Sequence, residues 1–177
     1  MVASTWPTAL DFVWLPENDG QDSHTDPGDI GGWTRWGVTH EDWADAVEHG
    51  IVTGPFANAS KSDLAAVLRR AWDVLRCDEL PAGVDLAVFN FAMVSTARHA
   101  VLVLQWALGV PQDGAFGPVT MAAVQGVPPV ALIADFTADE DRYYAELPTF
   151  PRFGKGWLRR ADDCQELALQ LARGAKP

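Results

Sequence analysis

One acidic segment near the start of the chain combines the residue types that could cleave a glycosidic bond. Glu17 follows an expected helix and precedes a stretch rich in Asp and Gly, which contains Asp26 and Asp29. Cleavage of such a bond needs a carboxylic acid that stays protonated near neutral pH, and usually a second carboxylate or a positioned water. Apolar neighbours such as Val13 and Trp14 would raise the pKa of Glu17 by desolvation. Taken alone, however, a Glu beside a Pro is usually an ordinary surface acid.

The residues that follow the acidic segment could bind a substrate or simply build a turn. Thr34 could orient a water, or it could be a hydroxyl that stabilises the turn. Trp33 and Trp36 flank it and could stack on sugar faces, although core packing fits an indole equally well. Gly31 and Gly32 would let the backbone approach a ligand closely, or would make a tight turn.

Other catalytic chemistries lack the residues that they need. The four histidines have no metal-ligand spacing, and no Ser or Cys lies in the sequence context of an activated nucleophile. The sequence contains no glycine-rich phosphate-binding loop. Cys77 and Cys164 are too few for a disulfide framework and are expected to be buried free thiols. We therefore expect neither a metal nor an organic cofactor.

Helices are the elements expected to position the acidic segment. Apolar periodicity predicts a first helix from Thr8 to just before Pro16, and residues 18–32 have the composition of an irregular loop or β-hairpin. Two further helices are expected behind N-caps at Thr39 and Ser62. Later helices are predicted over residues 81–91, 97–108 and 129–147, with a short one ending at Gly126, a loop over 148–156 and a last helix over 157–173. The pattern predicts a mainly α fold with one β-like excursion near its start.

Charge and composition exclude some partners. The net charge of −11 argues against nucleic acid, because phosphate binding needs clustered Lys and Arg. Six acids and no basic residue precede Arg35, whereas seven basic residues and four acids occur from Arg142 onward. This asymmetry is either a solvated surface or an acidic catalytic segment beside a basic tail that meets an anionic polymer. With no ordinary signal peptide and no apolar stretch of membrane-spanning length, we expect synthesis in the cytoplasm and no stable membrane insertion.

The pattern around Glu17 continues along nearly the whole chain as a series of motifs in a fixed order. They are Asp26-Pro27-Gly28-Asp29-Ile30-Gly31-Gly32-Trp33-Thr34, the run from Trp72 to Val84, Val88-Phe89-Asn90-Phe91-Ala92, Leu104-Gln105 with Asp113-Gly114, Gly117-Pro118 and Thr120, and Phe153-Gly154-Lys155-Gly156-Trp157. The series resembles the N-acetylmuramidases of glycoside hydrolase family 108, which occur as phage endolysins and as secretion-assisting murein hydrolases. Residues after Leu104 are similar to a peptidoglycan-binding signature.

The chain departs from the family's pattern at several positions. Asn18-Asp19 stands where the family has Gly-Gly, and the spacing from Glu17 to the Asp before the Gly pair is a few residues longer. The family shows an Asp and then Asn-Ser-Gly where this chain has Asn90 and then Val94-Ser95-Thr96. Asn90 cannot be a general base, and Val94 cannot hydrogen-bond a sugar. These departures bear on the substrate groove more than on Glu17.

The resemblance implies a lysozyme-like helical fold with a short irregular β-hairpin near the N-terminus. A muramidase part over residues 1–95 and a peptidoglycan-binding-like helical part over residues 96–177 would pack into one globule. The implied reaction is hydrolysis between N-acetylmuramic acid and N-acetylglucosamine, with Glu17 as the acid and Asp29, or else Asp26, as the second carboxylate. In the substrate-binding role we then expect a further set of side chains: Asp26, Gly32, Trp33, Thr34, Trp36, Asn90 and Ser95.

The implied partner is bacterial peptidoglycan, met by a monomer that reaches the cell wall by holin-type or other export. Two alternatives remain open at this point. A non-catalytic peptidoglycan-binding protein is favoured by the changes at Asn90, Val94 and Thr96. A peptidase or amidase would need a metal site or an activated Cys, and the sequence has neither.

Overall fold

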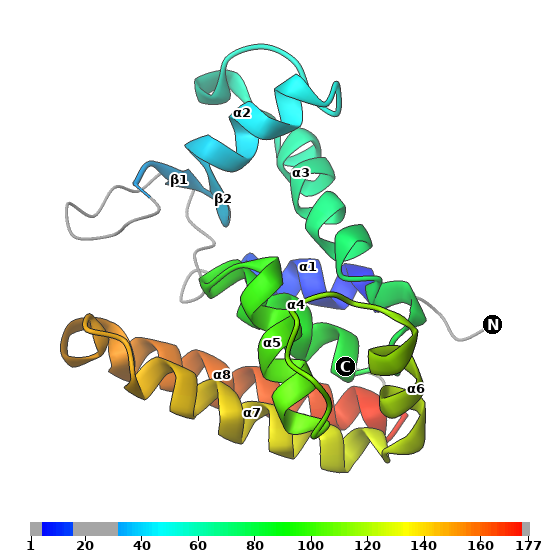
Figure 1. Cartoon of the computed structure of the whole chain (residues 1–177). Helices are drawn as coiled ribbons and strands as arrows, with labels where there is room; N and C mark the ends of the chain where they lie inside the picture. The colour runs from blue at the N-terminus through cyan, green and yellow to red at the C-terminus, as the bar shows by residue number, and fades with distance from the viewer. Residues whose placement is uncertain (1–4, 16–31, 175–177) are drawn as a thin grey trace.

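A computed structural model describes residues 5–15 and 32–174 of the chain, which form eight α-helices, two 3-10 helices and one two-stranded sheet (Figure 1). In chain order the elements are α1 (Trp6–Val13), β1 (Thr34–Arg35), β2 (Val38–Thr39), α2 (His40–Glu48), η2 (Phe56–Asn58), α3 (Lys61–Val74), η3 (Cys77–Glu79), α4 (Val84–Val94), α5 (Ala97–Ala107), α6 (Pro118–Gly126), α7 (Pro129–Ala145) and α8 (Phe150–Ala172). The prediction of a mainly α fold with a small hairpin near the N-terminus is confirmed. The hairpin lies at Thr34–Thr39, after the predicted residues 18–32, of which 18–31 lie outside the described residues.

Helix α4 is the centre of the molecule. Every residue from Val84 to Ala92 is buried, as expected for a helix that is apolar on all sides. Helices α5, α7 and α8 pack against α4, and α1 and α3 also contact it. In Figure 1, α7 and α8 run side by side as a long base, whereas α2, α3 and the hairpin rise above α1. The core therefore joins both halves of the sequence.

None of the helices in the described ranges is, by itself, long and apolar enough to cross a membrane. Only α6 and α7 taken together reach that length and composition, and a bend of 118° separates them.

The start of α4 is fixed by a buried carboxylate. Asp85 accepts hydrogen bonds from the backbone N–H groups of Gly83 (2.8 Å) and Leu86 (2.7 Å) and from the hydroxyl of Thr5. Burial raises the pKa of Asp85 to about 6 against these hydrogen bonds, which lower it. Because Thr5 is the residue at the N-cap of α1, this carboxylate ties the start of α1 to the start of α4.

Aromatic packing reinforces the same end of α1. The ring of Trp6 meets those of Trp72 and Phe89 edge to face, with centroids 5.4 and 5.7 Å apart, and Trp72 and Phe89 pack on each other at 5.3 Å. Such pairs contribute about 0.5–1.5 kcal/mol each beyond the area that they bury. The start of α1 is therefore held against α3 and α4 together.

The predicted N-cap at Thr39 is confirmed, but the one at Ser62 is wrong. Thr39 and Asp42 form a reciprocal capping box at the start of α2. Helix α3 is capped instead by Ser60, whose hydroxyl accepts from the backbone N–H of Asp63 while the Asp63 carboxylate accepts from that of Ser60. Ser62 could form no such pair, because the residue three positions later is Ala65.

The predicted loop over residues 148–156 is also wrong, because α8 begins at Phe150. Pro151 lies in its first turn, where the missing N–H costs no helical hydrogen bond. Gly154 lies under the Phe150 ring, and a Cβ there would come within 2.4 Å of a ring carbon. The glycines and proline that indicated a loop thus start a helix and let a ring pack closely on it. Cys77 and Cys164 are buried free thiols, as predicted.

Polar groups are buried between α4, α7 and α8. Glu140 on α7 accepts a hydrogen bond from the Tyr144 hydroxyl at 2.8 Å, and Arg160 on α8 donates through Nε to Oδ1 of Asn90 at 2.8 Å. All four side chains are at least 95% buried. Burial is the main cause that raises the pKa of Glu140 to about 8, so the group is mostly protonated at neutral pH.

Glu140→Gln should flatten the pH dependence of stability. The pKa of Glu140 is about 8 in the folded protein and 4.5 ordinarily, so the folded protein keeps a proton that the unfolded chain has released. Stability from this group is therefore fully present below the unfolded value and is lost as the pH rises through the folded one. Urea titrations across that range should show the free energy of unfolding of the wild type falling more steeply than that of the variant.

Glu146→Gln, at the exposed end of α7, is the matched control and should follow the wild type. Equal slopes for wild type and Glu140→Gln would contradict the prediction.

Candidate functional site

The candidate site residues divide between the described ranges and the rest of the chain. Glu17, Asp26 and Asp29 lie outside the described residues. In the sequence, Glu17 comes two residues after Leu15, and Asp29 comes three residues before Gly32. The described part of the site is therefore the end of α1 and the hairpin that begins after Gly32.

The hairpin turns within two residues. Arg35 pairs with Val38 across the antiparallel ladder, and Trp36 and Gly37 form the turn with φ of +50° and +79°. Two positive φ values are typical of the type I′ turn, whose usual residues are Asn and Gly. Gly37 also has no room for a side chain, because a Cβ would lie 2.9 Å from Cγ1 of Val13. The turn therefore lies directly against the end of α1.

Trp14, Trp36 and Lys61 form a cluster that links three elements. The indole N–H of Trp14 donates to the carbonyl of Trp36 at 3.1 Å, and the two rings meet edge to face at 6.0 Å. The Lys61 ammonium lies 3.5 Å from the centroid of the Trp36 ring and 4.9 Å from that of Trp14. The Trp14–Trp36–Lys61 cluster thus joins α1, the hairpin turn and the first residue of α3.

The contacts in this cluster are large enough to hold Trp36 in its unfavourable backbone conformation. A positive φ at a bulky residue costs about 1–3 kcal/mol. The indole hydrogen bond contributes about 1 kcal/mol, the ring pair about 0.5–1.5 kcal/mol and each exposed cation–π contact about 0.5–1 kcal/mol. Their sum matches or exceeds the strain.

Trp33, just before β1, lies in a second aromatic group with residues of α2 and η2. Its ring meets that of Phe56 edge to face at 4.8 Å and stacks on His40 at 6.2 Å, and the Trp43 ring also packs on Phe56 at 5.6 Å. Arg35 donates to the Phe56 carbonyl at 2.8 Å, which ties β1 to η2. Trp33 is half-buried, so packing accounts for much of its surface, and its predicted stacking on a sugar stays a prediction.

Thr34 and Gly32 precede the turn. Thr34 is 6% exposed and its hydroxyl points to the carbonyl of Gly32 at 3.4 Å, a long and weak hydrogen bond. This contact favours the turn-stabilising interpretation of Thr34. Gly32 has φ of +63°, and no described atom would lie within 4 Å of a Cβ placed there; its role in substrate binding stays a prediction.

Asn90 and Ser95 do not lie together at a surface. Asn90 is completely buried in α4 and holds Arg160, so in this structure its side chain cannot reach a substrate; the expectation that it lines the groove needs correction. Its partner Arg160 comes 70 residues later in the sequence, so no local pattern around Asn90 could predict this contact. Ser95 is half-buried at the end of α4, where its hydroxyl donates to the Phe91 carbonyl at 2.8 Å.

The stretch that resembles a peptidoglycan-binding signature folds into a self-contained loop. The Gln105 side chain is buried, and the two N–H groups of its Nε2 are shared among three acceptors, Asp113 Oδ1 (2.7 Å), the Ala115 carbonyl (3.0 Å) and Thr120 Oγ1 (3.1 Å). Its Oε1 accepts from the Gly114 N–H at 2.9 Å. The buried side chains of Gln105 and Thr120 are used to shape the loop, whereas Asp113 is exposed.

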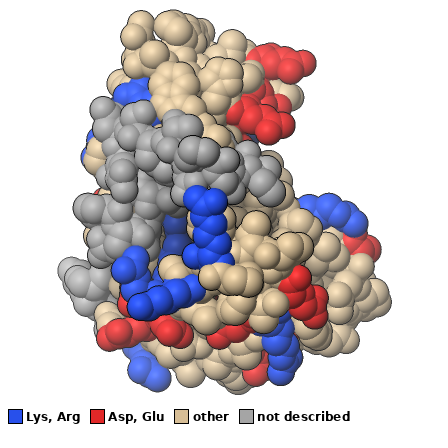
Figure 2. All heavy atoms as spheres, turned by 90° about the vertical axis from the view of Figure 1, so that its left-hand side faces the viewer, with Lys and Arg blue, Asp and Glu red and all other residues tan. Residues whose placement is uncertain are grey.

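Exposed cations mark the first half of α8. Arg152, Lys155 and Arg159 are exposed and follow the spacing that puts side chains on one helix face, and no acid occurs from Phe150 to Ala161. Figure 2 shows Lys and Arg side chains gathered in the middle and lower left of one face of the molecule, with acids beneath them and a separate acidic group at the upper right. In an acidic protein, such a gathering offers contact to an anionic polymer.

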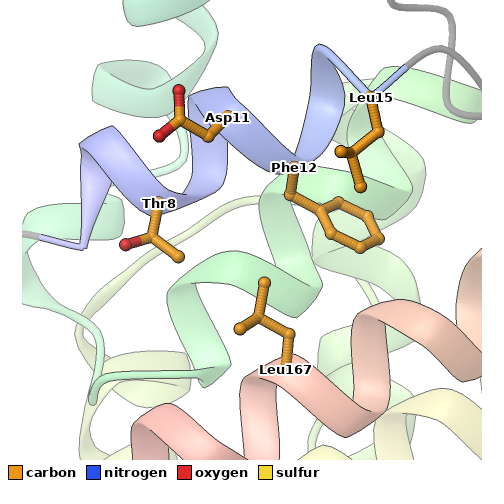
Figure 3. A pocket seen from close by; sticks show the side chains of 5 residues that line it. All are labelled: Thr8, Asp11, Phe12, Leu15 and Leu167. Carbon is orange, nitrogen blue, oxygen red and sulfur yellow. The ribbon is translucent and has the colours of Figure 1, made fainter. Parts of the chain in front are cut away.

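A depression of about 380 Å³ lies between α1 and α8 (Figure 3). Phe12 lines it from α1, Leu15 from the residues just after α1 and Leu167 from α8, whereas the Asp11 carboxylate points away from Leu167. A single carboxylate on an apolar wall lacks the second group that glycoside hydrolysis usually needs. Within residues 5–15 and 32–174, no three His, Cys, Asp or Glu side chains are placed to hold a metal ion.

Two family models match the chain in succession. Residues 14–95 match glycosyl hydrolase 108, and residues 99–162 match a predicted peptidoglycan domain. The structure of Brucella abortus SagA is similar, with a TM-score of 0.84 and 31% sequence identity over 96% of each chain. No curated protein matches significantly.

The structural similarity covers nearly the whole chain and so agrees with the described fold. The glycosyl hydrolase match includes the acidic segment and the hairpin. These findings make the chain a glycoside hydrolase that acts on peptidoglycan, and its glycosidase match begins just after α1 and includes the hairpin and α4. The resemblance proposed from the sequence motifs is confirmed: the chain is a member of the glycosyl hydrolase 108 family.

Proposed function

We propose that the protein is an endo-acting N-acetylmuramidase, a lysozyme that hydrolyses the bond between N-acetylmuramic acid and N-acetylglucosamine. Glu17 donates a proton to the leaving oxygen. Asp29 orients the attacking water or stabilises the positive charge that develops on the sugar.

The observation that carries this proposal is the contact between the end of α1 and the hairpin turn. Trp14 comes three residues before Glu17 in the sequence, and its indole donates to the carbonyl of Trp36, seven residues after Asp29. A pair of carboxylates on the two sides of a glycosidic bond must be held at a defined separation. The Trp14–Trp36 contact joins the end of α1 to the hairpin turn, the elements on the two sides of the acidic segment. It would therefore help to hold the two carboxylates at such a separation.

Apolar surroundings at the end of α1 support the role of Glu17. Val13 is completely buried, and Trp14 is half-buried under the Lys61 side chain. A carboxyl that follows such residues loses hydration when it packs on them, which keeps it protonated closer to neutral pH.

Asp29 is the better second carboxylate because it is closer in sequence to a fixed element. The described hairpin begins with Gly32 and Trp33, and β1 starts at Thr34. Only two residues separate Asp29 from Gly32, whereas five separate Asp26 from it. Since the reach of a chain grows with each residue, the hairpin restricts Asp29 more than Asp26.

The burial of Asn90 weakens the case for a non-catalytic binding protein. That alternative relied partly on an Asn where the family pattern has an Asp. In this structure residue 90 is inside the core against Arg160, so the change alters packing there and removes nothing from a surface groove. The exposed cations of α8 could bind the carboxylates of peptidoglycan stem peptides both in an enzyme and in a binding protein. They therefore do not distinguish between these two functions.

Glu17→Gln should abolish hydrolysis while the fold stays intact, because the amide keeps the shape but cannot donate a proton. The measurement is the release of new reducing ends from purified peptidoglycan, with circular dichroism as the check on folding. Asp11→Asn, on the exposed face of α1, is the control and should keep the wild-type rate. A Glu17→Gln rate within about tenfold of wild type would exclude Glu17 as the general acid, since such a group contributes about 100- to 10,000-fold.

Asp29→Asn and Asp26→Asn distinguish the two candidates for the second carboxylate. Asp29→Asn should lower the rate by about 100- to 10,000-fold, as expected for the loss of a positioned base or charge stabiliser. Asp26→Asn should have a mild effect in the same assay. The reverse order would transfer the role to Asp26, and near-normal rates in both variants would show that Glu17 works without either carboxylate.

A further inference from the structure

We propose that Trp14, Trp36 and Lys61 are positioning residues for the hydrolysis: they hold the end of α1 and the hairpin turn at the separation that the reacting groups need. This inference rests on the proposed function, because it assigns a purpose to the Trp14–Trp36–Lys61 cluster in that reaction.

The cluster connects three elements that are otherwise separate in the sequence. Trp14 directly follows α1, Trp36 is in the turn between β1 and β2, and Lys61 is the first residue of α3. Trp14 and Trp36 stand on opposite sides of the acidic segment that contains Glu17 and Asp29. A contact that fixes both sides of a segment reduces the number of conformations open to it.

The backbone of Trp36 indicates that this contact has a purpose beyond closing a turn. A turn at this position is less strained with Asn or Gly than with a bulky residue. Trp36 keeps φ of +50° and so presents its carbonyl to the Trp14 indole and its ring to Lys61. Backbone strain of this kind is concentrated where side chains must be placed for function.

Lys61 adds little to the packing of the core, but it contacts the rings of both Trp14 and Trp36. Its side chain is exposed, so replacing it leaves no cavity. Its ammonium nevertheless lies over both rings, at 3.5 and 4.9 Å from their centroids, while the rings meet at an angle of 70°. Loss of the charge is expected to loosen the two rings without unfolding the protein.

The test compares four single variants with wild type in steady-state hydrolysis of soluble glycan fragments. Trp14→Phe removes the indole N–H and keeps an aromatic ring, and Lys61→Met keeps the apolar stem without the charge. Both should lower kcat by about 10- to 100-fold, the cost of a misplaced reacting group, with KM little changed. Lys61→Arg should restore kcat, because a guanidinium also binds ring faces.

Trp43→Phe is the matched control. Its indole N–H also donates to a backbone carbonyl at 3.1 Å, that of Gly54, but it belongs to α2 and not to the cluster. Because Trp43 is more buried than Trp14, this variant should destabilise the protein at least as much as Trp14→Phe does and leave kcat unchanged.

The outcomes separate the two proposals. No hydrolysis by wild type would overturn the proposed function and this inference with it. With wild type active and Glu17→Gln inactive, an unchanged kcat in Trp14→Phe and Lys61→Met would overturn the inference alone. So would a rise in KM at constant kcat, which would make the cluster a substrate contact, or an equal fall of kcat in Trp43→Phe.

Discussion

An eight-residue helix such as α1 is too short to be stable in water by itself, so its position depends on what holds its two ends. Thr5 and Trp6 fix the start of α1 to α3 and α4 through the Asp85 carboxylate and a group of three rings. Val13 and Trp14 fix its end to the hairpin turn. In the sequence, Glu17 comes three residues after Trp14.

The two attachments differ in their chemistry. The first is buried, and it contains a carboxylate whose pKa is raised to about 6 by burial; such a group costs free energy unless its hydrogen bonds are satisfied, as they are here by Gly83, Leu86 and Thr5. The second is half-exposed and is built from ring contacts and one ammonium. Contacts in the core thus fix the start of α1, and the half-exposed cluster fixes its end.

Local signals in the sequence predicted much of the fold. The capping box at Thr39 and the end of α6 at Gly126 follow from residues within one helical turn. The hairpin turn had only a weak local signal: Thr34 precedes Trp36-Gly37 and Val38-Thr39 follows it, but Trp is not a usual residue of a two-residue turn. The Asp and Gly residues of 18–32 are more typical of a turn. The start of α8 was missed because Pro151 and Gly154 are typical of loops, and their use in a helix depends on how Phe150 packs.

The site was harder to predict than the fold, since its contacts join distant parts of the chain. The hydrogen bond of Trp14 spans 22 residues and that of Arg160 with Asn90 spans 70. No local pattern shows that Lys61 lies over two indoles or that Asn90 is inside the core. Motif order along the chain identified the family correctly, whereas the roles of individual motif residues required the structure, as the internal hydrogen bonds of Gln105 and Asp113 illustrate.

The most direct test of the account is mass spectrometry of purified peptidoglycan after digestion, with the new reducing ends marked by borohydride reduction. Hydrolysis by the proposed muramidase leaves N-acetylmuramic acid at the reducing end of each fragment, and Glu17→Gln should leave the polymer intact. Fragments that end in reduced N-acetylglucosamine, in a 1,6-anhydro sugar or at a cleaved peptide bond would contradict the account, as would an undigested polymer.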